Sequence, residues 1–194
     1  MLVLKEIKLK ELNKRMLDEN EDKEIVLGNG RVNSTIVLIG EAPGAKEVEA
    51  KLPFVGQAGK HLEEFLNILE LDRSELYITN TVKFRPTKES PKTGGKINRP
   101  PSKKEIKDFK EYLFDEINII KPKVIVTLGN IPLKTITGQE GSKIGDLHGK
   151  DSKVIIDGNE YCLFPLYHPA AVIYRRELKE VYYSDLEVLK KFLV

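Results

Sequence analysis

Cysteine is almost absent from this chain of 194 residues, which contains Cys162 alone. A single cysteine cannot form a disulfide within the chain, and it cannot supply the thiolates of a zinc or iron-sulfur cage. Long apolar runs are missing as well, and residues 1–6 include charged side chains that the apolar core of a signal peptide lacks. We therefore expect a protein of a reducing, cytoplasmic compartment that neither spans a membrane nor is exported.

An excess of charge of one sign is also missing, because the formal net charge is only +2. The distribution is uneven, since residues 83–110 contain ten basic and three acidic side chains, a local charge of about +7. Such a segment suits contacts with phosphate groups, which supply much of the sequence-independent affinity for nucleic acid. A solvated lysine-rich loop without a partner has the same composition.

Apolar runs and helical stripes alternate along the chain. Strands are expected at residues 35–39, 77–79, 124–128 and 161–166, and helices at residues 59–70, 106–120, 131–137 and from the capping-box sequence 184–187 onward. Residues 86–101 are rich in proline and glycine and are expected to form a long loop, while residues 157–159 favour a hairpin turn. The alternation predicts a single α/β domain of residues 1–194, with a helical extension at residues 1–30 packed on it.

The expected fold is a three-layer α/β/α arrangement around a mainly parallel, four-stranded sheet. Polar or glycine residues follow its strands: Glu41, Asn80, Gly129 and His168. The carboxyl ends of parallel strands meet at one edge of the sheet, where ligands bind. These residues therefore predict one pocket built from distant parts of the chain.

Each candidate residue has a chemical and a structural interpretation. Glu41 can orient or deprotonate water, or only anchor a helix start. Phe54 can stack on a base or plug the core, and Asn80 can present a donor and an acceptor to a planar ligand or cap a strand. His168 can donate a hydrogen bond to a developing anion, whereas His148 is a structural residue or a phosphate contact.

Four segments in sequence order resemble motifs of the uracil-DNA glycosylase superfamily, and most closely those of its family 4. They are residues 40–44 (GEAPG), 53–59 (PFVGQAG), 77–83 (YITNTVK) and 168–171 (HPAA), within a resemblance that covers roughly residues 20–193. The resemblance implies a monomeric DNA repair enzyme that flips uracil out of single- or double-stranded DNA. It would hydrolyse the N-glycosidic bond and leave an abasic site without cutting the strand.

The resemblance also implies roles for individual residues. Phe54 would stack on uracil, Asn80 would bind its polar edge, and the backbone of Gly40 and Ala42 would contact its carbonyl. His168 would stabilise the departing uracil, and Glu41 would orient the attacking water. The implied DNA contacts are Lys83, Arg85, Asn98 and Arg99 in the basic segment, and Ile173, Tyr174, Arg175 and Arg176 as a wedge with phosphate-binding arginines.

One departure from family 4 concerns its iron-sulfur cluster, which requires four cysteines. In this chain Phe84 and Phe109 stand where two of them fall, and the other pair is replaced near Asn13 and Met16. We therefore expect no cluster and no metal, with apolar packing of Phe84 and Phe109 in the structural role of the cluster. A superfamily variant that traps the sugar through a histidine is not supported, because residues 94–100 contain none.

Three other functions remain compatible with the sequence. The chain could be a catalytically silent DNA-binding or damage-sensing protein of the same fold, or a glycosylase for another deaminated base such as hypoxanthine. A small-molecule nucleotide hydrolase that cradles phosphate in the glycine loop is weaker, because no lysine-serine or acidic metal signature accompanies that loop.

Overall fold

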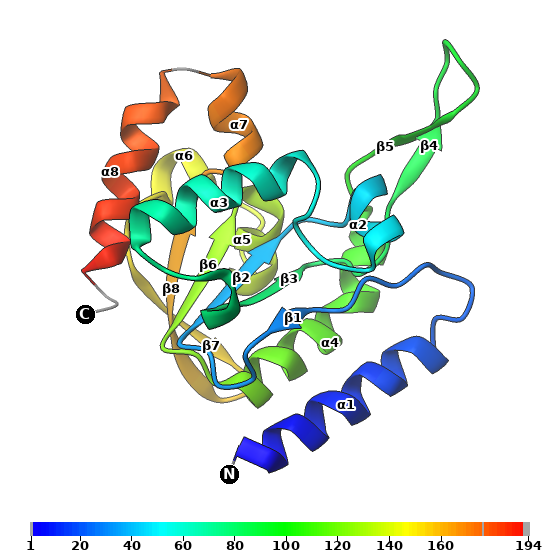
Figure 1. The fold of residues 1–194 in the computed structure, drawn as a ribbon, viewed down its shortest axis with the longest axis horizontal. Coiled ribbons are helices and arrows are strands. Elements are labelled where there is room, and N and C mark those ends of the chain that lie inside the picture. Colours follow the sequence, from blue (N-terminus) through cyan, green and yellow to red (C-terminus); the bar gives the residue numbers. More distant parts are fainter. Residues whose placement is uncertain (1, 176, 192–194) are drawn as a thin grey trace.

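The computed structural model describes residues 2–175 and 177–191, and a six-stranded sheet lies at its centre (Figure 1). In spatial order the strands are β1 (Asn29–Gly30), β3 (Tyr77–Asn80), β2 (Ile36–Gly40), β6 (Val124–Leu128), β8 (Asn159–Leu166) and β7 (Ser152–Ile156). The four central strands are parallel, as expected, while β1 and β7 pair antiparallel at the two edges. The expected four-stranded sheet therefore lacked the two edge strands, although the expected hairpin turn at residues 157–159 is confirmed and joins β7 to β8.

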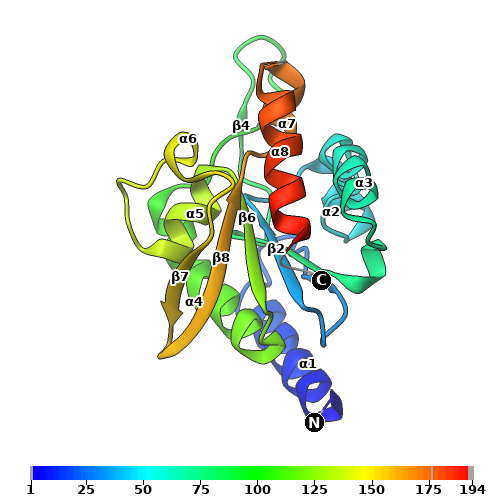
Figure 2. The same ribbon diagram turned by 90° about the vertical axis from the view of Figure 1, so that its left-hand side faces the viewer.

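Helices cover both faces of the sheet, which gives the expected three layers (Figure 2). One face packs against α1 (Leu2–Asp18), α4 (Lys103–Ile120) and α5 (Asn130–Thr137), and the other against α3 (Gln57–Leu69) and α8 (Leu178–Lys190). The shorter helices are α2 (Ala45–Ala50), η1 (Arg73–Glu75), α6 (Ile144–Leu147) and α7 (Pro169–Tyr174). None of the helices in the described residues has the length and apolarity needed to cross a membrane.

Alternation along β2 shows why this sequence forms a central strand. Ile36 and Leu38 belong to the apolar cluster beneath α3 and α8, whereas Val37 and Ile39 belong to the cluster beneath α4. All five residues of β2 are buried, as expected for a strand covered on both faces. An apolar run without polar alternation thus specifies a strand between two helical layers.

Two expected boundaries were wrong. Helix α8 begins at Leu178 rather than at the capping-box sequence 184–187, because Tyr182, Leu186 and Leu189 continue one buried stripe. The side chain of Asp185 does not cap a helix and instead bonds Nδ1 of His148 at 2.8 Å. Residues 29–30, expected within the helical extension, form strand β1, and the helical part of that extension is α1 alone.

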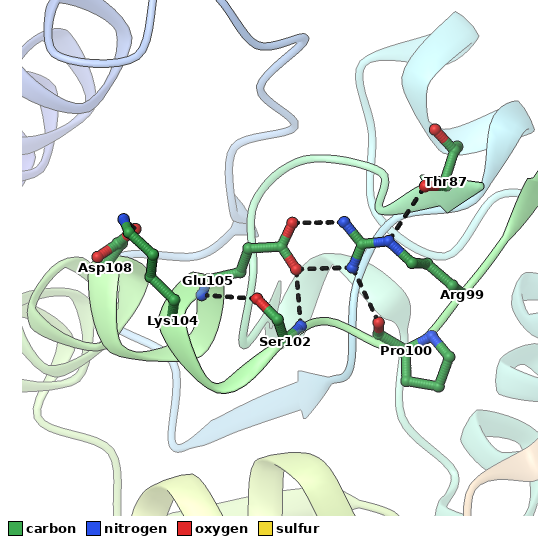
Figure 3. Close-up of polar contacts among 7 residues, drawn as sticks. All are labelled: Thr87, Arg99, Pro100, Ser102, Lys104, Glu105 and Asp108. Carbon is green, nitrogen blue, oxygen red and sulfur yellow. Dashed lines mark hydrogen bonds and ion pairs between the residues drawn. The ribbon is translucent and has the colours of Figure 1, made fainter.

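The expected long loop contains a small hairpin that projects beyond the sheet (Figure 1). Its strands, β4 (Thr87–Glu89) and β5 (Lys96–Asn98), form a separate two-stranded sheet. Arg99 closes the base of the hairpin by donating from Nε to the Thr87 carbonyl at 3.1 Å and from both terminal nitrogens to Glu105 at 2.7 and 2.6 Å (Figure 3). Glu105 also accepts the backbone N–H of Ser102, so one carboxylate joins the hairpin to the start of α4.

Replacing Glu105 with Gln should lower the free energy of unfolding by about 1–2 kcal/mol at neutral pH, because a bidentate charged pair is lost. The hydrogen bonds from Arg99 lower the pKa of Glu105 to about 2. The stabilisation is therefore present above the ordinary pKa of a glutamate and is lost as the pH falls toward 2. Urea denaturation over this range should show wild type and variant converging.

A matched control is Glu160→Gln, whose pair with Lys153 is exposed and should contribute little. An equal loss of stability in both variants would contradict a specific role for the contact between Arg99 and Glu105.

Candidate functional site

The site begins with the parallel pairing of β2 and β3, which places Gly40 directly beside Asn80. The pairing extends past the strand ends. The N–H of Thr81 donates to the Gly40 carbonyl at 2.8 Å, and the N–H of Val82 donates to the Glu41 carbonyl at 3.1 Å. Glu41 and Asn80, which are distant in the sequence, are thus held on neighbouring backbones.

Gly40 allows two further side chains to approach. A Cβ atom at this position would lie 2.5 Å from Oδ1 of Asn80 and 2.5 Å from Cζ of Phe54. Real Cβ contacts are essentially never so short, so a side chain here would displace the amide or the ring. The requirement for glycine comes from this close approach and not from the backbone torsion.

Phe54 lies in the left-handed region with a φ of 54°, an unusual conformation for an aromatic residue. Arg73 holds it there by donating to the carbonyls of Phe54, at 2.9 Å, and of Pro53. The ring is 5% exposed and stacks toward His168 with 6.3 Å between ring centroids. Phe54 thus links the segment after β2 to the residue after β8.

Glu47, which sequence reasoning missed, fixes the same loop. Its buried carboxylate accepts backbone N–H groups from Gly44 at 3.1 Å, Val55 at 3.0 Å and Gly56 at 2.6 Å. The available signal was its spacing, since a glutamate three residues after a helix cap commonly binds the cap backbone. The contacts with Val55 and Gly56 depend on the fold and leave no local pattern.

Two adjoining cavities lie at this edge of the sheet. The larger, of about 340 Å³, is lined by Ala42, Phe54, Asn80 and His168 among others. The smaller, of about 220 Å³, is lined by Glu41 and shares Ala42, Asn98 and His168 with the larger. Every candidate catalytic and base-binding side chain therefore lines one of the two cavities, with Glu41 in the cavity that Phe54 does not line.

His168 is the N-cap residue of α7, and its Nδ1 accepts the backbone N–H of Ala170 at 3.2 Å. Burial lowers the pKa of His168, which favours the neutral imidazole at neutral pH. Since Nδ1 is an acceptor, the hydrogen of the neutral ring lies on Nε2. His168 is thereby prepared to donate a hydrogen bond from Nε2 without carrying a positive charge.

The Glu41 carboxyl is half-buried, and its desolvation raises the pKa of this group. A raised pKa makes the carboxylate a better proton acceptor than an exposed glutamate. Glu41 can therefore orient or deprotonate a water molecule in the smaller cavity, beside His168.

The residues predicted to contact DNA lie in different environments in the structure. Lys83 requires a correction, because its side chain is fully buried and pairs with Glu116, so it is not available to a phosphate. Arg85 donates to Asn98, which lines both cavities, at 2.7 Å. Arg99 lines the smaller cavity, and its guanidinium is engaged in the hairpin contact with Glu105. Arg175 is exposed; Arg176 and the side chains of Ile173 and Tyr174 lie outside the described residues.

The residues expected to replace the cluster cysteines do not provide the ligands of an iron-sulfur cluster. Phe84 packs on Phe109 with 5.5 Å between ring centroids, and Phe109 and Met16 lie in the same buried apolar cluster. The buried Oδ1 of Asn13 has no hydrogen-bond partner, but it is an amide oxygen and not a thiolate. Within residues 2–175 and 177–191, no group of three His, Cys, Asp or Glu side chains could hold a metal ion.

The parallel sheet, with a cavity at its carboxyl edge lined by an aromatic ring and an amide, defines an α/β protein with a candidate ligand site at this edge. Comparison with known protein families shows which family has this fold and sequence. Residues 27–187 match the model of the uracil DNA glycosylase superfamily, and the chain belongs to this family.

The relatives of this chain agree with the family match. A type-4 uracil-DNA glycosylase of Pyrobaculum aerophilum is 38% identical over 84% of this chain and 81% of its own length. The type-4 uracil-DNA glycosylases of Sulfurisphaera tokodaii and Archaeoglobus fulgidus are 37% and 38% identical, over 87% and 84% of this chain and 74% and 78% of their own lengths. The resemblance to family 4 inferred from the four motifs is thus confirmed.

Glu47→Gln should loosen the loop that holds Phe54, because an amide replaces one of the two acceptor oxygens. We expect a loss of about 1–3 kcal/mol of stability and faster hydrogen exchange at the amides of Val55 and Gly56. Glu49→Gln, on the same short helix and largely exposed, is the control. Unchanged exchange at Val55 and Gly56 in the Glu47 variant would show that the carboxylate does not fix this loop.

Proposed function

We propose that this protein is a monofunctional DNA repair glycosylase that removes uracil, the product of cytosine deamination, and leaves an abasic site. The observation that carries the proposal is the convergence of Glu41, Phe54, Asn80 and His168 on two adjoining cavities. The family match and the names of the relatives support the same activity. DNA containing uracil, single- or double-stranded, is the proposed partner of a monomeric, cytoplasmic protein.

Recognition takes place in the larger cavity after the nucleotide has been flipped out of the helix, at a cost of a few kcal/mol. Phe54 supplies the ring against which the base stacks, and the Asn80 amide offers a donor and an acceptor to its polar edge. The backbone at Gly40 and Ala42 contacts a uracil carbonyl. Cytosine presents a different donor and acceptor pattern, so its binding would leave buried polar groups unpaired.

Cleavage of the glycosidic bond places negative charge on the departing uracil and positive charge on the sugar. The Nε2–H of neutral His168 stabilises the charge on uracil, and Glu41 orients water toward the sugar from the smaller cavity. An oxocarbenium-like sugar accepts even a weak nucleophile, so positioning of the water supplies much of the effect. Water as nucleophile leaves no lysine adduct and no strand break.

The direct test is incubation with uracil-containing single- and double-stranded oligonucleotides, followed by alkaline cleavage at abasic sites. Asn80→Ala and His168→Ala should each slow release by about 10²–10³-fold, because each removes a donor to the base or its developing charge. DNA affinity should be unchanged in both. Asn67→Ala and His61→Ala, which alter the same residue types on α3, are the controls.

The outcome also separates the alternative functions. Unaltered rates in both the Asn80 and His168 variants would reject the assigned pocket. Binding without release from uracil or hypoxanthine substrates would identify a silent DNA-binding protein, and release from hypoxanthine alone would identify a different base specificity.

We also propose that the protein works without an iron-sulfur cluster. The basis is the single cysteine of the sequence and the packed aromatic pair at Phe84 and Phe109. Protein purified without oxygen should show no visible cluster absorption and less than stoichiometric iron, and chelators should not change its melting temperature. A visible band together with stoichiometric iron would overturn this proposal.

A further inference from the structure

A buried ion pair lies directly behind the base-binding strand. Nζ of Lys83 and Oε2 of Glu116 are 2.5 Å apart, and both side chains are 0% exposed. Burying two charges costs desolvation free energy, which their attraction offsets only with good geometry and additional hydrogen bonds. The pair is therefore poorly explained as a simple source of stability, and its contacts suggest another role.

The pair holds β3 from the side opposite the pocket. Oε1 and Oε2 of Glu116 accept from the hydroxyls of Tyr77 at 3.2 Å and Thr79 at 3.0 Å, and Lys83 also donates to the Thr79 hydroxyl. Successive side chains of a strand point to opposite faces, so Tyr77 and Thr79 face α4 while Asn80 faces the cavity. Three side chains bind one carboxylate, immediately behind the amide that contacts the base.

Lys83 also fixes the chain that follows Asn80. Its side chain is tied to Glu116 on α4, and its carbonyl accepts the N–H of Val26 at 2.7 Å. The N–H groups of Thr81 and Val82, which lie between Asn80 and Lys83, donate to the carbonyls of Gly40 and Glu41, respectively. The segment from Asn80 to Lys83 is thus bound to the first motif on one side and to α4 on the other.

Each side chain in this network has a defined role as a hydrogen-bond donor or acceptor. Burial, followed by the charge of Glu116, raises the pKa of Tyr77 well above its ordinary value, so its hydroxyl remains a donor. Burial lowers the pKa of Lys83, and the neighbouring carboxylate opposes this shift. Glu116 is the common acceptor for all three side chains.

An aromatic contact extends the same attachment by one residue. Phe84 packs on Phe109, and Phe109 packs on Tyr112 at 5.8 Å between ring centroids. Phe109, Tyr112 and Glu116 lie on one stripe of α4 at helical spacing. Residues 83 and 84 are therefore attached to this stripe by one ion pair and one ring contact.

We propose that Lys83 and Glu116 are positioning residues that hold the Asn80 amide in register with the base pocket. This inference rests on the proposed glycosylase function. It assigns Lys83 to the interior of the protein and not to the DNA surface.

The test uses the neutral double variant Lys83→Met/Glu116→Gln, in which the amide introduced at position 116 keeps one oxygen acceptor for the neighbouring hydroxyls. Removing both charges avoids leaving one buried charge unpaired, so the variant should fold. Single-turnover uracil release should slow by about a hundredfold, because small displacements of a substrate-binding group have effects of this size. DNA affinity should not change. The exposed pair in Lys153→Met/Glu160→Gln is the matched control.

A second comparison separates positioning from a general structural role. In an Asn80→Ala background the double substitution should cause little further slowing, since Asn80 is the group through which the pair acts. Equal slowing with and without Asn80, or a lower melting temperature with an unchanged rate, would overturn the inference. Thr79→Val, which removes only the shared hydroxyl, should slow release about tenfold and covers the case in which the double variant does not fold.

The same experiments distinguish a wrong glycosylase assignment from a wrong positioning role. If the unaltered protein releases no uracil, the glycosylase assignment itself is rejected before any variant is compared. If the unaltered protein is active and the variants are as fast, only the positioning role is rejected.

Discussion

The parallel pairing of β2 with β3 is the constraint on which the rest of the site depends. It places Gly40 beside Asn80, and backbone hydrogen bonds continue the pairing through Thr81 and Val82. The adjoining strands β6 and β8 then bring His168 to the same edge. A shift of this register by one residue would turn the Asn80 side chain to the opposite face of the sheet and remove it from the cavity.

Three glutamates do similar structural work around this edge. Glu47 fixes the loop that contains Phe54, Glu105 fixes the hairpin through Arg99, and Glu116 fixes the strand end through Lys83. In each case a carboxylate on a helix accepts hydrogen bonds from a segment that forms or adjoins the cavities. Carboxylates suit this role because each offers two strong acceptor oxygens to several donors at once. A chain with one cysteine can thus hold its site with polar contacts.

The sequence predicted the central strands well because each is a short apolar run, and it predicted the pocket because polar residues follow those runs. The edge strand β1 was missed, since two residues without an apolar pattern acquire a partner only in the fold. Lys83 was assigned to DNA on its charge, yet its burial depends on Glu116, which lies 33 residues away. Such long-range pairs leave no local pattern. Glu47 had a local signal in its spacing from Gly44, but its contacts with Val55 and Gly56 depend on the fold.

Ala42, Phe54, Asn80 and His168 line the cavity proposed to bind uracil. Nuclear magnetic resonance of labelled protein titrated with free uracil tests this proposal most directly. We predict shifts in the Asn80 side-chain amide and the Ala42 N–H, with much weaker changes for cytosine at the same concentration. Shifts confined to other parts of the molecule, such as the groove between α3 and α8 lined by His61 and Tyr182, would contradict the account.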